Sequence, residues 1–196
     1  MYVSKEKVIL TDCDGVLFDW VHGFMNYMEG RGYSPVRGWG AMYKINEVFG
    51  VDKEVTKPLV SSFNESAWIR DLTPFRDAVK YVRKLHTDHG YVFHAITSQS
   101  DCPKARQLRI ENLEAVFGKG IFEVVTCLPC GGDKDEALAK YKGTGCFWVE
   151  DKAENADVGA AAGLNSLLLA HGYNVAYNGD AVRVNNWHEI YNIITG

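Results

Sequence analysis

The stretch Ile9-Leu10-Thr11-Asp12-Cys13-Asp14-Gly15-Val16-Leu17 decides which fold we expect for this chain. A short apolar run ends in two acids one residue apart, and a glycine follows at once. Because residues i and i+2 of an extended segment point the same way, Asp12 and Asp14 can face one small space at the end of a strand. Two carboxylates so close repel each other unless a cation or a proton lies between them. The pair therefore indicates a metal site, an acid–base site, or both.

The dipeptide Asp14-Gly15 is also common in turns, so a simple surface turn is the alternative interpretation. An EF-hand loop is excluded because the third acid and the closing Glu are missing at their offsets. An amphipathic segment from Trp20 to Met28 follows the turn. A strand, an acidic loop and then a helix are where α/β enzymes place their chemistry.

The composition is that of an ordinary globular protein. A length of 196 residues fits one domain with an insertion, and 46% hydrophobic residues are enough for a sizeable core. The net charge of −4 gives no general attraction to nucleic acid or to anionic membranes. No apolar run approaches the length of a membrane span, and residues 1–7 lack the apolar region of a signal peptide.

The five cysteines are an odd number without a secretion signal, which favours reduced thiols and a cytoplasmic protein. Cys127 and Cys130 have the spacing of a redox or zinc pair. They follow a predicted strand rather than opening a helix, and no second close Cys/His pair accompanies them. We therefore prefer the interpretation that they are two small apolar residues beside a loop.

Apolar, strand-like runs alternate with helical segments along most of the chain. Pro at helix starts and Gly after helix ends support several boundaries. The predicted strands are residues 7–11, 91–96, 121–126, 146–149 and 166–169, and the predicted helices are residues 75–89, 103–117, 133–141 and 153–162. This alternation predicts an α/β fold: a three-layer, Rossmann-like core with a parallel sheet between helices.

The region Asp19–Leu72 breaks the alternation. It contains no convincing core strand, and it is rich in aromatic residues at helical spacing. We expect a small helical cap (residues 19–72) inserted after the first strand of a core domain formed by residues 1–18 and 73–196. Caps exclude water from a reacting centre, although most of these aromatics can equally fill the cap's own core. The sequence indicates no role for Asn174, Arg183 or Trp187.

Polar groups follow several of the predicted strands. Thr97-Ser98 ends the second strand, Lys134 follows the third, and Glu150-Asp151 ends the fourth. Because the carboxyl ends of parallel strands lie along one edge of a sheet, these groups can converge on Asp12 and Asp14. Each alone has an ordinary alternative: a loop hydroxyl, a solvated lysine and a helix N-cap.

The ordered set resembles the motifs of the haloacid dehalogenase-like superfamily of phosphohydrolases. The first motif is similar to Asp12-Cys13-Asp14-Gly15-Val16, the second to Thr97, the third to Lys134, and the fourth to Glu150-Asp151 followed by Asn155. The second acid of the first motif points to phosphoryl transfer, since dehalogenating members generally lack it.

The 5′(3′)-deoxyribonucleotidase-like branch of that superfamily gives a closer resemblance. It rests on Asp14–Trp20, on Ile96-Thr97-Ser98, on Trp68–Pro74 and on Asp133-Lys134. Two positions depart from the branch: Glu150 replaces an Asp, and Gln99 replaces a Pro.

The resemblance implies a catalytic set of four residues. Asp12 is the expected nucleophile, and Asp14 is the expected general acid and base, which requires a raised pKa. Thr97 and Lys134 are expected to bind the phosphate. The substrate-binding candidates are Ser98, Gly15 and Trp20, where the Trp20 ring either stacks on a nucleobase or packs between cap and core.

The resemblance also implies a Mg²⁺ site. Asp12, the backbone carbonyl of Asp14, and Asp151 are the expected ligands, although Asp151 can instead cap the following helix. Glu150 and Asn155 are expected to support these ligands, with Glu150 as a reserve ligand.

We therefore expect a Mg²⁺-dependent phosphomonoester hydrolase that forms an aspartyl-phosphate, with a (deoxy)nucleoside monophosphate as substrate. The alternatives are a sugar-phosphate phosphatase, a phosphotransferase and a non-catalytic module that binds a phospholigand. The expected partner is a small molecule rather than a nucleic acid polymer or a membrane, and the sequence leaves room for a homodimer.

Overall fold

The computed structural model describes residues 7–75 and 77–196. The prediction that residues 1–7 are not a signal peptide concerns a segment of which only Lys7 is among the described residues. Arg76, within the predicted helix 75–89, also lies outside them.

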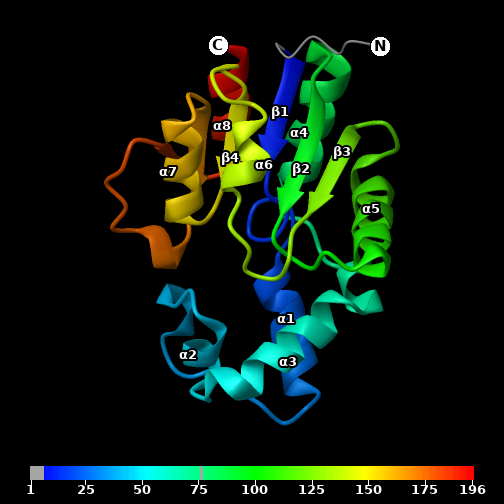
Figure 1. Cartoon of the computed structure of the whole chain (residues 1–196), viewed down its shortest axis with the longest axis vertical. Coiled ribbons are helices and arrows are strands. Elements are labelled where there is room, and N and C mark those ends of the chain that lie inside the picture. The colour runs from blue at the N-terminus through cyan, green and yellow to red at the C-terminus, as the bar shows by residue number, and fades with distance from the viewer. Residues whose placement is uncertain (1–6, 76) are drawn as a thin grey trace.

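A six-stranded parallel sheet forms the centre of the molecule (Figure 1). Its spatial order is β3-β2-β1-β4-β5-β6. The strands are β1 (Val8–Thr11), β2 (Val92–Thr97), β3 (Phe122–Cys127), β4 (Phe147–Glu150), β5 (Asn165–Leu169) and β6 (Val182–Val184). The five predicted strands are each found within one residue of their expected limits, whereas β6 was not predicted.

Helices cover both faces of the sheet, as expected for alternating strands and helices. The residues of β1 show the two faces, because Ile9 belongs to the core under one helical layer and Leu10 to the core under the other. One layer consists of α4 (Ala78–His89), α5 (Pro103–Phe117) and α8 (Trp187–Thr195), and the other of α6 (Asp135–Ala139) and α7 (Ala153–Ala161). The predicted three-layer α/β fold class is confirmed; the final helix, α8, was not predicted.

The segment after β1 is helical and lies beyond the carboxyl ends of β1, β2 and β3, at the bottom of Figure 1. Its helices are α1 (Trp20–Glu29), η2 (Trp39–Ala41), α2 (Ile45–Phe49), α3 (Lys53–Asn64) and η3 (Ala67–Ile69). We call residues 20–69 the helical segment. Phe24, Tyr27 and Phe63 are buried at its centre and meet edge-on or stacked. Its treatment as a separate domain stays a prediction.

Two short connections join the helical segment to the rest of the chain, and they lie side by side. The N–H of Asp19 donates to the carbonyl of Thr73 at 2.9 Å, and the N–H of Phe75 donates to the carbonyl of Leu17 at 3.0 Å. The acidic loop after β1 therefore leads directly into one connection.

The C-terminal helix α8 contacts the acidic loop. Trp187 is fully buried, and its indole N–H donates to the carbonyl of Val16 at 2.9 Å. This contact gives Trp187 a structural role that the sequence did not indicate.

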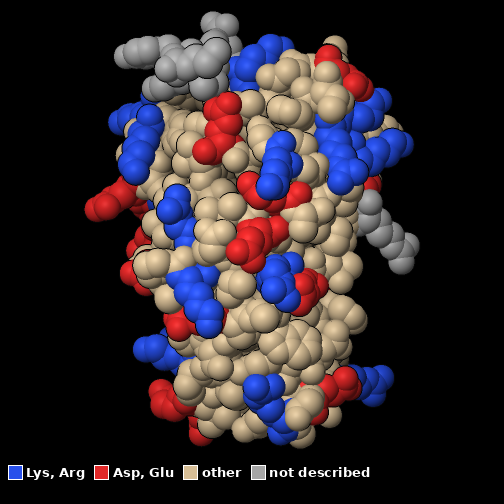
Figure 2. All heavy atoms as spheres, turned by 90° about the vertical axis from the view of Figure 1, so that its right-hand side faces the viewer, with Lys and Arg blue, Asp and Glu red and all other residues tan. Residues whose placement is uncertain are grey.

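The surface shown in Figure 2 carries acidic and basic side chains interspersed rather than gathered by sign. None of the helices within residues 7–75 and 77–196 has both the length and the apolar character needed to cross a membrane.

Candidate active site

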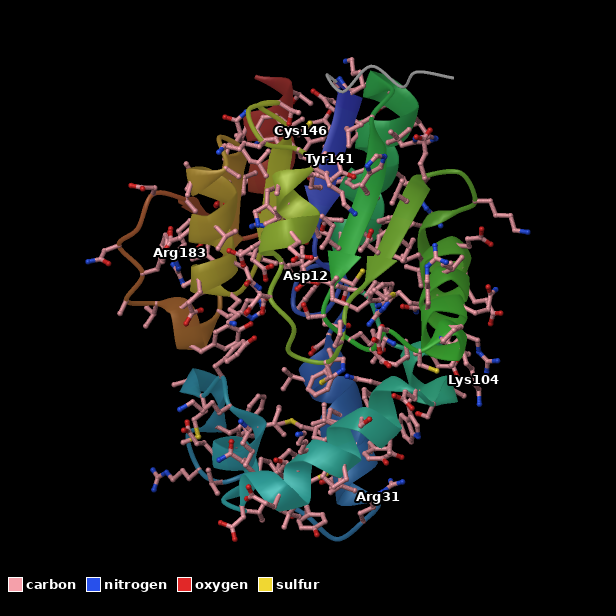
Figure 3. All side chains as sticks on the ribbon, in the orientation of Figure 1. Asp12, Arg31, Lys104, Tyr141, Cys146 and Arg183 are labelled. Carbon is pink, nitrogen blue, oxygen red and sulfur yellow. The ribbon has the colours of Figure 1, made fainter. Side chains whose placement is uncertain are left out.

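The centre of the site is the ammonium group of Lys134, which lies between two carboxylates. Lys134 Nζ is 2.7 Å from Asp12 Oδ2 and 2.7 Å from Glu150 Oε2. The side chain of Lys134 is 2% exposed, so its charge is shielded from water. Burial works against the ammonium charge, but Asp12 and Glu150 outweigh it and raise the pKa of Lys134. Lys134 is therefore a fixed cation at the carboxyl end of the sheet, where Figure 3 places Asp12.

Four protein donors satisfy the carboxylate of Glu150. Oε1 accepts from the backbone N–H groups of Asp151 and Lys152, each at 3.0 Å. Oε2 accepts from Lys134 and, at 3.3 Å, from Asn155 Nδ2. With four donors in place, Glu150 serves to hold Lys134 and the turn after β4, while Asp12 and Asp151 keep free lone pairs. This geometry favours the predicted supporting role of Glu150 and Asn155 over that of a reserve ligand.

Asp151 lies beside Asp12 although 138 residues separate them in the chain. One carboxylate oxygen each of Asp12, Glu150 and Asp151 lie within 4.8 Å of one another, and all three residues are buried. The Tyr173 hydroxyl donates to Asp151 Oδ2, and Asn174 Nδ2 donates to the Asp151 carbonyl at 2.8 Å. The arrangement brings together two of the residues that the sequence predicted as metal ligands.

The charge of this cluster fits a divalent cation. Three buried carboxylates face the single ammonium of Lys134, so two negative charges are left uncompensated. Burial raises the pKa values of Asp12 and Asp151 to about 6; the charge of Glu150 adds to the rise at Asp12, and the charge of Asp12 adds to the rise at Asp151. A cation that binds here would take oxygen ligands from Asp12 and Asp151, as hard cations prefer.

Asp14 offers two separate groups. Its backbone carbonyl oxygen receives no hydrogen bond from any described residue, so it is available as the third predicted ligand. Its side chain turns toward α5, where Arg109 Nη2 donates to Asp14 Oδ1. Burial raises the pKa of Asp14, while the Arg109 charge opposes that rise. The direction of this shift is the one that a general acid needs.

Gly15 makes room for Asp151. Its φ is 81°, in the left-handed region that favours glycine, and a Cβ atom there would lie 2.6 Å from Asp151 Cγ. Both of its backbone polar groups are engaged: the N–H donates to the Phe18 carbonyl at 2.9 Å, and the carbonyl oxygen is 2.7 Å from His171 Nε2. The substrate contact expected of Gly15 stays a prediction, whereas its steric role is visible.

Thr97 and Ser98 lie at the end of β2. The side chain of Thr97 is buried, and no described residue forms a hydrogen bond with its hydroxyl, which leaves that group free for a ligand. The Ser98 hydroxyl donates to the Gly132 carbonyl at 2.7 Å. Ser98 therefore ties β2 to the loop that carries Lys134.

Trp20 is held within the junction between the helical segment and the core. Its ring stacks on Phe24 with centroids 4.8 Å apart, and its indole N–H donates to Asn64 Oδ1 at 2.9 Å. These contacts favour the packing interpretation for one ring face. Stacking of Trp20 on a nucleobase stays a prediction.

Cys127 and Cys130 join no cluster of three metal-ligating side chains among the described residues. Burial raises the pKa values of both thiols, which favours the neutral, unreactive form.

Four residues near the acids were missed in the sequence. Arg109 lies on the buried face of α5 with Ala105 and Leu113. An arginine at a position where the helical spacing expects an apolar residue was the sequence signal that could have identified it. His171 and Tyr173 follow β5 directly, so the strand-end rule applied to the first four strands would have found them. Tyr43 comes from the helical segment and meets Tyr173 edge-on at 5.3 Å; no sequence pattern distinguished it from its aromatic neighbours.

Solved structures share this architecture over nearly the whole chain. A haloacid dehalogenase-like family hydrolase from Streptococcus pneumoniae has a TM-score of 0.67 at 13% identity, covering 97% of this chain and 99% of that one. The chain has the haloacid dehalogenase-like fold. The same fold is seen in L-2-haloacid dehalogenase from Xanthobacter autotrophicus with chloropropionic acid covalently bound (TM-score 0.63, 14% identity, 97% and 98% covered). CbbY from Rhodobacter sphaeroides in complex with phosphate also has it (TM-score 0.61, 12% identity, 94% and 96% covered).

Sequence comparison gives a relative without a known activity. An uncharacterized 32.4 kDa protein of Enterobacteria phage T4, from the Gp30-rIII intergenic region, is 28% identical over 196 residues, covering 95% of this chain and 69% of that protein. No protein-family model matches the chain.

The role of Gly15 can be tested with a matched pair of substitutions. Gly15→Ala should weaken divalent-cation binding by about ten-fold or more, because its methyl group displaces the Asp151 carboxylate. Gly32 has nearly the same φ, 82°, and nothing within 4 Å of a Cβ, so Gly32→Ala carries the backbone strain without the collision. Titration calorimetry of both variants should show the loss in Gly15→Ala only; an equal loss in both would contradict this role.

Cation binding should also depend on pH in a defined direction. Below about pH 6 the carboxyl groups of Asp12 and Asp151 hold protons, which a cation must displace. We expect the affinity measured by calorimetry to fall by at least about ten-fold between pH 7.5 and pH 5.0. An affinity independent of pH over this range would show that these two carboxylates do not bind the ion.

Proposed function

We propose that the protein is a Mg²⁺-dependent phosphomonoester hydrolase of the haloacid dehalogenase-like superfamily, which acts through an aspartyl-phosphate on Asp12. The observation that carries this proposal is the contact of Lys134 with Asp12 beside the third acid, Asp151. It supplies a carboxylate nucleophile, a fixed positive charge and a place for a divalent cation within one small space. The covalently bound chloropropionic acid in one structure of this fold and the phosphate in another are in keeping with a covalent route and a phosphate ligand.

The main obstacle to the reaction is electrostatic. A carboxylate that approaches a phosphate dianion meets about 4 kcal/mol of repulsion per pair of unit charges at ~4 Å and an effective dielectric near 20. Lys134 offsets part of this repulsion, and its burial keeps that charge unscreened. Mg²⁺, when bound by Asp12, the Asp14 carbonyl and Asp151, supplies further positive charge for the phosphate oxygens.

The chain's own residues then divide the chemistry. An Asp12 oxygen attacks phosphorus while the bond from phosphorus to the leaving oxygen breaks, and Asp14 gives its proton to that oxygen. In the second step water attacks phosphorus, Asp14 takes a proton from that water, and Asp12 is released. The free hydroxyl of Thr97 donates to a phosphate oxygen.

The second acid separates this proposal from dehalogenation. A halide leaves without a proton, so a dehalogenase needs no acid at position 14, whereas an alkoxide leaving group does. The half-buried Asp14 with its raised pKa therefore favours a phosphate ester as substrate.

For the substrate we propose a (deoxy)nucleoside monophosphate, on the resemblance of Asp14–Trp20 and Ile96-Thr97-Ser98 to the deoxyribonucleotidase-like branch. The exposed aromatic residues Trp39, Tyr43 and Trp68 of the helical segment are candidate surfaces for a planar base. A sugar-phosphate phosphatase or phosphotransferase is the second candidate, since the same aspartyl-phosphate can pass its phosphoryl group to water or to a sugar hydroxyl.

The function is tested by phosphate release from a panel of nucleoside 5′- and 3′-monophosphates and sugar phosphates, with and without Mg²⁺. Asp12→Asn should lower kcat by at least about 10³-fold, because an amide oxygen is a poor nucleophile. Asp133, the exposed residue before Lys134, gives a matched control: Asp133→Asn should keep full activity. Activity that survives in Asp12→Asn would refute the covalent mechanism, and a preference for sugar phosphates would refute the nucleotidase assignment alone.

A further inference from the structure

Arg109 is a fully buried arginine that the mechanism above does not use. Its relative exposure is 0%, and its guanidinium donates to three different side chains. Nε donates to Gln99 Oε1 at 2.8 Å, Nη1 donates to Asn112 Oδ1 at 3.3 Å, and Nη2 donates to Asp14 Oδ1. All three guanidinium nitrogens are therefore held by protein acceptors.

The contact with Asp14 leaves one carboxylate oxygen free. Arg109 takes Oδ1, and no described residue donates to Oδ2. The side chain of Asp14 is 22% exposed, whereas that of Arg109 is 0% exposed. One oxygen of Asp14 is thus held from the interior of the core, while the other accepts from no described residue and the side chain is partly accessible to solvent.

From Arg109 the hydrogen bonds continue into the helical segment. Gln99 Nε2 donates to the Asn64 carbonyl at 2.8 Å, and Asn64 Nδ2 donates to the Gln99 carbonyl at 2.9 Å. Asn64 is the last residue of α3, and it accepts from the indole N–H of Trp20, the first residue of α1. Hydrogen-bonded polar side chains therefore link Asp14 to α3 and α1 of the helical segment.

A purely stabilising role is a poor explanation for this arrangement. Replacing a buried ion pair with well-packed apolar residues is often neutral or stabilising, so the pair alone is weak evidence for stability. Direct binding of substrate by Arg109 is also a poor explanation, because its guanidinium is enclosed and each of its three nitrogens already donates to a protein acceptor.

We propose that Arg109 is a positioning residue that fixes the carboxyl group of Asp14 for proton transfer, and that Gln99 and Asn64 tie its position to the helical segment. The inference rests on the proposed function, in which Asp14 protonates the leaving oxygen and then takes a proton from water. Arg109 holds Oδ1, so Oδ2 is the atom that gives and receives the proton in both steps. Rotation of the carboxyl group away from the leaving oxygen would break the contact with Arg109, which makes the held orientation the favoured one.

Two phosphate esters separate this role from a structural one. Leaving-group release in the first turnover is measured with thymidine 5′-monophosphate, whose alkoxide needs a proton, and with 4-nitrophenyl phosphate, whose phenolate does not. Arg109→Gln should slow release from the nucleotide by about 100-fold, the lower range of general acid catalysis, with KM changed less than about three-fold. Release from 4-nitrophenyl phosphate should change less than about three-fold.

The matched control lies on the same helix. Arg106 is exposed, and its Nε donates to the Val125 carbonyl at 3.1 Å rather than to Asp14, so Arg106→Gln should behave as the wild type with both esters. Arg109→Lys keeps a charge near Asp14 and should recover part of the nucleotide rate. Equal losses with both esters in Arg109→Gln would show a structural role, and a raised KM with unchanged kcat would show direct phosphate binding; either result overturns the proposal.

A second variant covers the case in which Arg109→Gln does not fold. Gln99→Leu removes the acceptor of Arg109 Nε and the hydrogen bond that the Gln99 side chain donates to the Asn64 carbonyl, and should slow nucleotide release about ten-fold while sparing the aryl ester. Unchanged rates with both esters would refute the link to the helical segment.

Failure of the proposed function has a different signature. It would appear as a wild type that releases neither leaving group in the presence of Mg²⁺. In that case the Arg109 contact is tested by urea unfolding of Arg109→Gln, Asp14→Asn and the double variant. If the shift of the urea midpoint in the double variant equals the sum of the shifts in the two single variants, the two side chains do not interact, and the inference is overturned.

Discussion

The burial of one ammonium group between two carboxylates is the constraint on which the site depends. Lys134 lies 2.7 Å from both Asp12 and Glu150 and has almost no access to water. A charge in that position is strongly destabilising without partners, so the ends of β1 and β4 and the loop after β3 must meet there. Removal of either carboxylate would leave the ammonium with one partner. In the proposed reaction, the same contact that holds three chain segments together would also supply the positive charge that a phosphate dianion requires, so folding and the proposed chemistry rest on one interaction.

The remaining features keep the second half of the site in place. Gly15 lets the Asp151 carboxylate lie against the acidic loop, and Tyr173 and Asn174 hold Asp151 from the turn after β5. Arg109 performs the corresponding task for Asp14 from α5. A close approach also joins the helical segment to this turn, because a Cβ atom at Gly172 would overlap the Gly40 carbonyl oxygen. Segments from the whole chain thus surround the site. The helical segment reaches Asp151 through Tyr173, and it reaches Asp14 through Gln99 and Arg109.

The sequence allowed a correct prediction of the groups whose position follows from the sheet itself. Parallel strands end at one edge, so Asp12, Lys134 and Asp151 could be brought together from strand ends alone. Arg109 could not be placed in this way, because its partner lies across the core and only tertiary packing brings α5 to the acidic loop. The four-donor environment of Glu150 depends on the conformation of its own turn, and β6 has only three residues, too few for a periodic pattern. The contact of Tyr43 with Tyr173 depends on how the helical segment rests on the core, which no local pattern encodes.

A crystal structure with Mg²⁺ and trifluoroberyllate, a mimic of the phosphoryl group on a carboxylate, tests the central claim most directly. The account predicts beryllium bonded to one oxygen of Asp12, Lys134 Nζ within hydrogen-bond distance of a fluoride, and one Mg²⁺ at about 2.1 Å from oxygens of Asp12 and Asp151. An adduct on any other carboxylate, or a Mg²⁺ ion that binds away from Asp12 and Asp151, would contradict it.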